Sequence, residues 1–369
     1  MNPTRLTLPL ALLAAVVVGA GCGSDDSEDT SGSSKDEAQA GEAQAGASTP
    51  DLDGQKLVFV NYGGDTLVAA EEGWLDPFSA ESGVQIATDS PSDPAKVKAM
   101  VEAGRTTWDV IDLDAASGGA QCGTLFEERE NIDISAIDPK YISDLCGVPI
   151  MVQAIALVYN NELYGDNPPT KVTDFMDTEA FPGKRIIFNY AVGGIEPILL
   201  ADGVEPDELF PLDYDRAASA IERLGGDLVF HAELAQQEQA LQSGDFAMCL
   251  CYTGRAAVTA EKGADIGVVW DSAYMAWDAL YAIKGSEYPE AQEALMNYIA
   301  TPEAQAAFTE TLPYGPTTPS SEPQISDLFK EFLPDFHEEE IGTRALYDAQ
   351  WWIENADKAF AEWTAMTAG

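Results

Sequence analysis

Residues 56–114 decide the fold class, and they read KLVFVNYGGDTLVAAEEGWLDPFSAESGVQIATDSPSDPAKVKAMVEAGRTTWDVIDLD. Three short runs in this stretch are apolar and rich in β-branched side chains, and each run predicts a buried strand. Between them lie two segments with apolar residues at helical spacing, the second opened by Pro94 after a capping Ser92 or Asp93. The predicted order is strand 56–62, helix 66–83, strand 84–90, helix 93–104 and strand 108–114. This alternation is typical of an α/β fold with a parallel sheet.

The carboxyl ends of these strands are the expected place for a ligand, because parallel sheets bind ligands in the crevice beyond that edge. The residues at these ends are Tyr62, the glycines 63–64, Ser90 and the turn 112–119. We therefore expect them to surround one crevice.

The second half of the chain repeats the alternation of strands and helices. The predicted strands are 155–159, 184–190, 246–254, 265–270 and 275–285. The predicted helices are 216–225, 230–245, 255–264, 288–311 with a break at Pro302, and a C-terminal helix whose apolar stripe is Leu346, Trp352, Ala359 and Trp363. Because 369 residues are also too many for one ordinary core, the sequence predicts two lobes.

The charge of the chain limits its partners. Its 63 acidic and 19 basic residues give a formal net charge of −44. Such a surface repels phosphate groups, so we expect no nucleic-acid partner. The same field mildly favours cationic solutes.

The N-terminal residues have the pattern of a lipoprotein signal. Arg5 precedes an apolar run, 6–18, that is too short to span a bilayer comfortably, and three small residues stand directly before Cys22. We predict a signal peptide at residues 1–21 and lipid modification of Cys22, with plain secretion as the alternative. Residues 22–54 lack aromatic side chains and predict a flexible acidic tether.

The cysteines predict one disulfide and no metal site. Cys122 and Cys146 lie in loop-like sequence, and in an oxidising compartment we expect them to form a bridge. Cys249 and Cys251 lie two residues apart in a predicted strand, which places them about 6.5–7 Å apart on one face. That separation is too large for a disulfide, so we predict buried, reduced thiols.

No pattern of residues predicts an enzyme or a cofactor. The chain has no Gly-x-Ser-x-Gly elbow and no Walker loop, and its two histidines show no ligand spacing. What recurs is an aromatic residue beside a carboxylate, a combination that holds an ammonium group. The positions are Trp270-Asp271, Tyr274, Trp277-Asp278 and Tyr314. The alternative is that Trp270 and Trp277 are core residues.

Several longer segments carry a family resemblance. They include VPIMVQAIALVYNNE, FPGKRIIFNYAVGGIEPILLADGVEPDELFPLDYDRA, QALQSGDFAMCLCYTGRAA and ATPEAQAAFTETLPYGPTTP. With these segments the chain resembles the bacterial extracellular solute-binding proteins of ABC importers, in particular the spermidine/putrescine-binding group. The resemblance covers nearly everything from residue 57 to the C-terminus.

The resemblance implies a two-lobed periplasmic-binding-protein-like fold of type II, with the ligand cleft between the lobes. It assigns residues 55–152 and 279–315 to lobe 1, and residues 153–278 and 316–369 to lobe 2. It also places the run 252–255 at the cleft wall, with a tyrosine where relatives carry tryptophan. The ligand-binding residues that it implies are Tyr62, Ser90, Asp114, Glu196, Tyr252, Asp278 and Tyr314.

The function implied is that of a lipid-anchored receptor outside the cytoplasm, in the periplasm or at the cell surface. We expect a monomer that closes about segments 152–155 and 278–284 over a small cationic solute such as a polyamine, and then delivers it to a membrane permease. The alternatives are the same role for a sugar, a thiamine-like cation or a metal chelate, or a secreted hydrolase. The hydrolase has no supporting motif.

Overall fold

The computed structural model describes residues 52–164, 167–343 and 345–368. Contacts within the chain divide it after Ala47, and every described residue lies in the unit Ser48–Gly369. Among the described residues, no helix combines the length and the apolar character needed to cross a bilayer.

The N-terminal predictions fall largely outside this part. The signal peptide 1–21, the lipidation site Cys22 and most of the tether 22–54 lie outside the described residues. Leu52 is nevertheless buried in the hydrophobic core. The folded part therefore begins before residue 54, the predicted end of the tether.

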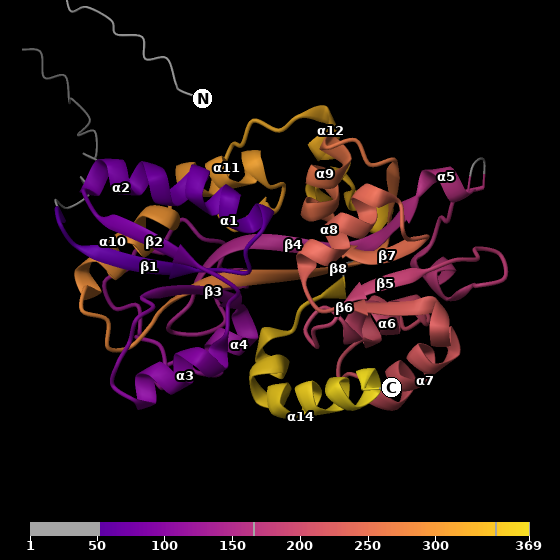
Figure 1. The fold of residues 1–369 in the computed structure, drawn as a ribbon, viewed down its shortest axis with the longest axis horizontal. Helices are drawn as coiled ribbons and strands as arrows, with labels where there is room; N and C mark the ends of the chain where they lie inside the picture. Colours follow the sequence, from indigo (N-terminus) through magenta and orange to yellow (C-terminus); the bar gives the residue numbers. More distant parts are fainter. Residues whose placement is uncertain (1–51, 165–166, 344, 369) are drawn as a thin grey trace, which may run out of the picture. The chain divides into compact units, whose positions relative to one another are not determined.

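One sheet, with ten strands among the described residues, forms the centre of the unit (Figure 1). Along the sheet the strands are β2 (Gln85–Asp89), β1 (Lys56–Val60), β3 (Val110–Asp114), β8 (Ile266–Ala282), β4 (Val148–Asn160), β7 (Met248–Tyr252), β5 (Arg185–Phe188) and β6 (Leu228–His231). Two-residue strands, β9 (Gly315–Pro316) and β10 (Ala345–Leu346), pair with β4 and β8. β1 pairs in parallel with β2 and β3, and β5 pairs in parallel with β6 and β7, so parallel strands are confirmed in both halves.

Two long strands, β4 and β8, run antiparallel through the middle of the sheet and join its two parallel parts. The sequence predicts two separate strands, 265–270 and 275–285, where the structure has the single strand β8. The polar pair Asp271-Ser272 interrupts the apolar pattern there. The structure accommodates this pair in a register shift against β4, with Ser272 at a φ of 53°.

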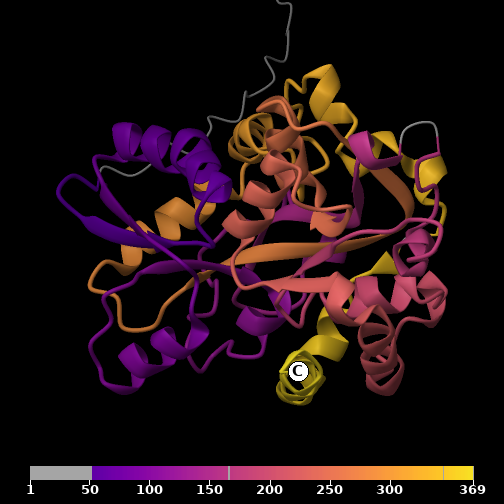
Figure 2. The ribbon, with the colours of Figure 1, turned by 45° about the vertical axis from the view of Figure 1, so that its right-hand side comes forward.

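Helices cover both faces of the sheet (Figures 1 and 2). Over one face lie α1 (Asp65–Ala70), α2 (Asp76–Ser82), α8 (Leu234–Ser243), α9 (Thr253–Glu261), α11 (Pro302–Thr311) and α12 (Asp327–Lys330). Over the other lie α3 (Pro94–Glu102), α4 (Ala115–Gly119), α6 (Ile195–Ala201), α7 (Tyr214–Leu224) and α14 (Ala349–Thr367). The remaining α-helices of the described ranges are α5 (Asn161–Tyr164), α10 (Pro289–Ile299) and α13 (Glu338–Ile341), and a π-helical turn, Glu71–Leu75, joins α1 to α2.

Local chemistry explains two of these helices. Asp93 caps α3, because its carboxylate accepts hydrogen bonds from the backbone N–H groups of Ala95 and Lys96 at 2.9 and 3.1 Å. α11 packs on the π-helical turn through Trp74, whose ring stacks on Phe308 at 4.3 Å. The indole N–H of Trp74 also donates to the carbonyl of Ala304 at 2.8 Å.

Two helix predictions need correction. Residues 228–231 form the strand β6, although the sequence predicts a helix from residue 230. In the C-terminal stripe, Trp352, Ala359 and Trp363 are buried as predicted, but Leu346 lies in β10 and is 54% exposed. Leu346 precedes the helix, so helical spacing does not govern its direction.

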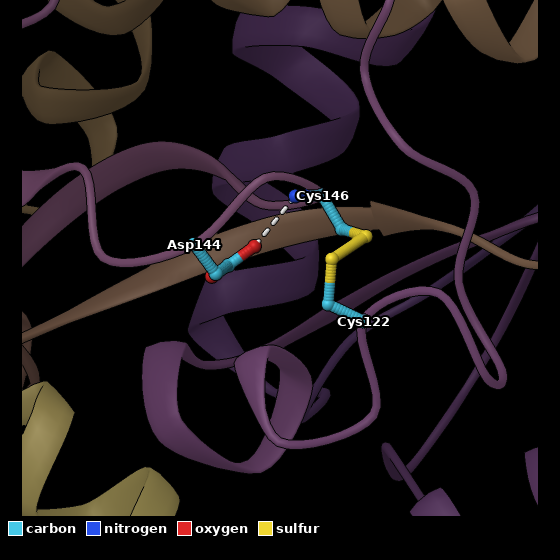
Figure 3. A group of neighbouring side chains, drawn as sticks. All are labelled: Cys122, Asp144 and Cys146. Atoms are coloured by element: carbon cyan, nitrogen blue, oxygen red, sulfur yellow. Dashed lines mark hydrogen bonds between the residues drawn. A yellow bond between two sulfur atoms is a disulfide. The ribbon is translucent and has the colours of Figure 1, made fainter.

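The disulfide between Cys122 and Cys146 is confirmed, with Cα atoms 5.5 Å apart. Figure 3 shows Asp144 beside it, where its carboxylate accepts a hydrogen bond from the Cys146 backbone N–H at 2.6 Å. The structure also joins Cys249 to Cys251, so the prediction of reduced thiols there is wrong. Their Cα atoms are 5.2 Å apart, which is closer than in a regular strand and within the range of disulfides.

Candidate functional site

A narrow cavity of about 30 Å³ lies where strand ends from both parallel parts of the sheet meet. Five of the seven predicted ligand-binding residues line it, namely Tyr62, Asp114, Tyr252, Asp278 and Tyr314. The wall also contains residues outside the predicted ligand set, among them Gln153, Phe188, Tyr190, Gly193, Leu234 and Arg255. The expectation that strand ends converge on one crevice is therefore confirmed.

Strand geometry explains how these side chains meet. Tyr62 follows β1, Asp114 ends β3, Tyr190 follows β5 and Tyr252 ends β7. All four lie at carboxyl ends of parallel strands, where α/β sheets form their crevices. Asp278 reaches the same place from the C-terminal third of the crossing strand β8.

Two carboxyl groups face each other in the cavity wall. Asp114 and Asp278 are directly opposite partners in the antiparallel pairing of β3 with β8. Like charges in such a pair are destabilising. Burial raises the pKa of Asp278 to about 8, and the neighbouring Asp114 adds to the rise. Asp278 therefore holds a proton near neutral pH, and a cationic group can take the place of that proton.

Asp114 is held in place by three donors. Its Oδ1 accepts from the Ser117 backbone N–H at 2.9 Å and from the Tyr347 hydroxyl at 3.2 Å. Its Oδ2 accepts from the Tyr190 hydroxyl at 3.0 Å. These bonds fix the carboxylate at the start of α4, so the cavity has one rigid acidic wall.

Arg255 brings a positive charge to the same cavity. It lies in α9 and is buried, with hydrogen bonds to the Glu238 carboxylate, the Thr66 hydroxyl and, at 3.2 Å, the carbonyl of Gly63. Within the part of the chain that the structure describes, its Nε–H has no hydrogen-bond acceptor. A buried guanidinium N–H without an acceptor is a natural binding point for a carboxylate.

Tyrosine side chains form much of the remaining wall. Burial raises the pKa of Tyr62, Tyr190 and Tyr252 well above the ordinary value. Burial likewise raises the pKa of Tyr314. These phenols therefore stay neutral at physiological pH, and they offer ring faces and hydroxyl groups to a solute.

Glu196 lies behind the cavity and does not line it. The side chain is fully buried in α6, and its Oε2 accepts from the backbone N–H of Gly193, a wall residue, at 3.0 Å. Its Oε1 accepts from the Tyr274 hydroxyl and the Trp352 indole N–H, both at 2.7 Å. Burial raises the pKa of Glu196 to about 7, against the effect of these hydrogen bonds. The geometry fits a residue that shapes the wall.

Ser90 lies in a neighbouring space of about 280 Å³. Tyr62, Phe188, Leu234 and Arg255 line both spaces, so the two are contiguous. Ser90 therefore lies outside the inner cavity, in the space beside it.

The repeated pattern of an aromatic beside a carboxylate marks the site only in part, because Asp278 and Tyr314 line the cavity and the other residues of the pattern do not. Trp270 stacks on His337 at 4.8 Å, away from the cavity wall. Trp277 packs on Tyr347 with ring centres 5.0 Å apart. Neighbouring residues in a strand point to opposite faces, so Trp277 and Asp278 cannot both face the cavity.

Two other wall residues, Tyr190 and Gln153, could also have been predicted from the sequence. Tyr190 follows a predicted strand and could have been found by the rule that identified Tyr62. Gln153 is the single polar residue within the apolar run of β4. A lone polar residue in a buried strand needs a partner, and Gln153 finds it in Asp278.

Comparisons with known proteins agree with this geometry. The family model described as bacterial extracellular solute-binding protein matches residues 73–331.

The chain belongs to this family.

Its relatives are binding proteins and receptors. A γ-aminobutyric acid-binding protein of Pseudomonas aeruginosa is 29% identical over 324 residues, which cover 84% of this chain and 91% of the relative. The solved Atu4243–GABA receptor is 30% identical, with a TM-score of 0.75 and coverage of 85% of this chain and 97% of that one. The binding protein AgtB of A. tumefaciens R10, solved with agropinic acid, is 27% identical, with a TM-score of 0.76 and coverage of 85% and 99%.

These similarities confirm the two-lobed periplasmic-binding-protein fold. They also support a solute-binding role without catalysis, since the family binds solutes. They do not single out the spermidine/putrescine group.

Proposed function

We propose that this protein is the solute receptor of an ABC importer and that it captures a small molecule carrying both an ammonium group and a carboxylate. γ-Aminobutyrate is the simplest model, and two of the relatives above are named for it. One observation carries the proposal: the acidic pair Asp114–Asp278 and the buried Arg255, whose Nε–H is unpaired among the described residues, line the same cavity.

The ammonium group would bind at the acidic pair. An ammonium ion between Asp114 and Asp278 would take the place of the proton that Asp278 holds and would donate a charge-assisted hydrogen bond to each carboxylate. The neighbouring tyrosine rings add cation–π attraction of about 0.5–2 kcal/mol each. Gln153, which donates to Asp278, would hold that carboxylate in position.

The carboxylate would bind at Arg255. Its unpaired Nε–H can donate to one oxygen of the solute, and this contact satisfies a buried donor that otherwise has none within the described residues. Because the Nη atoms already bond Glu238, Gly63 and Thr66, the guanidinium is fixed before the solute arrives. Such preorganisation reduces the entropy lost on binding.

A polyamine is the competing solute. The acidic pair and the tyrosine rings suit it, and the overall negative charge would attract it. Arg255 argues against it, because a polyamine offers only positive charge to a buried cation. A neutral sugar fits less well still, since it would leave buried charged groups without charged partners.

Closure of the lobes would trap the solute. If residues 55–152 with 279–315 and residues 153–278 with 316–369 form the two lobes, Arg255 connects one lobe to Gly63 of the other. A solute carboxylate on Arg255 would then stabilise the closed form. The bending points would be 152–155 and 278–284, in or next to the crossing strands β4 and β8.

A second ion pair would support the same closed form. Lys262 at the end of α9 binds Asp65 at the start of α1, with an N–O distance of 3.0 Å. Under the proposed lobe assignment this pair also crosses between lobes. We further propose that Cys22 is lipidated after removal of residues 1–21, and that the protein acts as a monomer outside the cytoplasm.

A thermal-shift panel of γ-aminobutyrate, putrescine, spermidine and glucose with the purified protein tests the solute class. At 100 times its Kd a solute adds about 2.7 kcal/mol of stability, which corresponds to roughly 4 °C in Tm for a folded part of this size. We expect this shift with γ-aminobutyrate and its loss in Arg255→Met, while the exposed Arg105→Met keeps it. If putrescine raises the Tm of both the wild type and Arg255→Met, the solute is a polyamine instead.

A further inference from the structure

Asp112 is a buried carboxyl group that no contact described above uses. It is the central residue of β3 and is 1% exposed. Neither of its carboxyl oxygens has a hydrogen-bond partner anywhere in the described ranges. Residues two apart in a strand share a face, so Asp112 lies on the same face of β3 as Asp114, one step behind the acidic pair.

The groups around Asp112 are mostly acidic. Asp278 on β8 and Asp114 on β3 raise its pKa further beyond the dominant effect of burial, whereas the charge of Arg255 on α9 lowers it. From the segment after β1, Tyr62 also interacts with it electrostatically. Three carboxyl groups therefore share one cation, and that cation is already bonded to Glu238.

Asn61 gives a second, independent sign of an incomplete polar cluster. β1 and β3 pair in parallel through Val60 and Ile111, so Asn61, directly after β1, stands next in register to Asp112 in the middle of β3. The Asn61 side chain is fully buried, and its Oδ1 accepts from the Gly63 backbone N–H at 2.8 Å, which fixes the orientation of the amide. Its Nδ2, like the oxygens of Asp112, lacks a partner among the described residues.

Burying an ionised carboxylate without hydrogen bonds is energetically unfavourable, so such a group stays protonated and neutral instead. Binding of an ammonium group one step away changes this balance. The new positive charge favours ionisation of the nearby carboxyl, because opposite charges a few ångströms apart attract strongly in a poorly solvated site.

We propose that Asp112 is a positioning residue of the solute site, which holds a proton in the unliganded protein and releases it when an ammonium group binds at Asp114 and Asp278. The inference rests on the proposed function. The O–H bond of the Asp112 carboxyl breaks, its electron pair stays on the oxygen, and the proton passes to the buffer. The solute cation then replaces the charge of the proton, and solute capture becomes linked to pH.

The consequence is a defined pH profile. Because binding releases protons, the affinity for the solute weakens as the pH falls. Asp278, which also holds a proton near neutral pH, contributes to the same linkage. Asp112→Asn should make the affinity less dependent on pH without removing the contacts of the acidic pair.

The test is titration calorimetry of γ-aminobutyrate, and of putrescine in parallel, in buffers of different ionisation enthalpy at pH 7. The slope of the observed enthalpy against the buffer enthalpy counts the protons released. We expect release by the wild type, about one proton fewer in Asp112→Asn, and wild-type release in the exposed control Asp327→Asn. Thermal unfolding checks that Asp112→Asn, a change of similar size, is folded.

The outcomes separate the two proposals. Binding without proton release by the wild type would overturn the role of Asp112, whatever the variant does. Equal release by wild type and Asp112→Asn would overturn it as well. If neither amine binds, the proposed function fails and takes this inference with it.

Discussion

Replacing Glu196 by glutamine should remove a pH-dependent part of the stability of this protein. In the unfolded chain Glu196 ionises near its ordinary pKa of 4.5, whereas burial raises its pKa in the folded protein to about 7. Between these values the folded protein binds more protons than the unfolded chain, so its stability falls as the pH rises. The favourable contribution is complete below pH 4.5 and is lost as the pH passes through 7.

The size of the effect follows from the shift of the pKa. Each unit corresponds to about 1.4 kcal/mol, so the free energy of unfolding of the wild type should fall by about 3 kcal/mol relative to Glu196→Gln across this range. Because both oxygens of Glu196 accept hydrogen bonds, the variant also places its amide NH₂ group against at least one of these donors. This mismatch costs about 1–3 kcal/mol, but it is independent of pH and leaves the slope unchanged.

Urea unfolding followed by tryptophan fluorescence, at pH values from 4.5 to 8, measures this difference. Glu208→Gln, an exposed glutamate, is the matched control. A flat difference between wild type and Glu196→Gln would refute the reasoning. A wild type that gains relative stability as the pH rises would show that the three donors around Glu196 outweigh the effect of burial.

Two further changes follow from packing and covalent structure. In Gly254→Ala the added Cβ would clash with the ring of Tyr314 in the cavity wall. The solute affinity measured by calorimetry should therefore drop about tenfold or more. The control Gly226→Ala, whose added Cβ would meet nothing within 4 Å, should bind the solute as the wild type does. Unchanged affinity in Gly254→Ala would show that this wall does not contact the solute. Replacing both Cys122 and Cys146 by alanine opens a loop with a sequence separation of 24 and should lower the free energy of unfolding by about 3 kcal/mol. Equal denaturant midpoints for this variant and the oxidised wild type would contradict that expectation.

The sequence was sufficient for those parts of the site that depend on local pattern. Tyr62, Asp114 and Tyr252 end or follow apolar runs, and the rule that parallel strands open to ligands at their carboxyl ends placed all three correctly. Cys122 and Cys146 could be paired because both lie in loop-like sequence. These features need only the order of strands and helices.

Other features depend on contacts between distant residues. Glu196 sits in a segment with no polar pattern, and its donors Tyr274 and Trp352 lie 78 and 156 residues away. Only the folded chain shows that these donors surround it and turn it away from the cavity. Asp112 and Asp114 lie two residues apart in one predicted strand, and spacing alone does not show that only Asp114 reaches the wall.

The remaining predictions that the structure contradicts depend on the geometry and register of the strands. Trp277 and Asp278 are neighbours in sequence, and the sequence pattern predicts that they act together, but adjacent strand residues face opposite ways. The predicted break in β8 failed because a register shift against β4 carries the polar pair 271–272 through the sheet. The link between Cys249 and Cys251 required a local shortening of β7 that strand periodicity does not predict.

The central claim is that one buried cavity recognises both ends of a zwitterion, through Asp114 and Asp278 at one end and Arg255 at the other. Calorimetric affinities for γ-aminobutyrate and its two half-analogues, n-butylamine without the carboxylate and butyrate without the amine, test it most directly. Loss of one buried charge pair costs about 2–5 kcal/mol, so each half-analogue should bind at least about 30-fold more weakly than γ-aminobutyrate. Butylamine binding as tightly as γ-aminobutyrate would contradict the account, because Arg255 would then have no part in recognition.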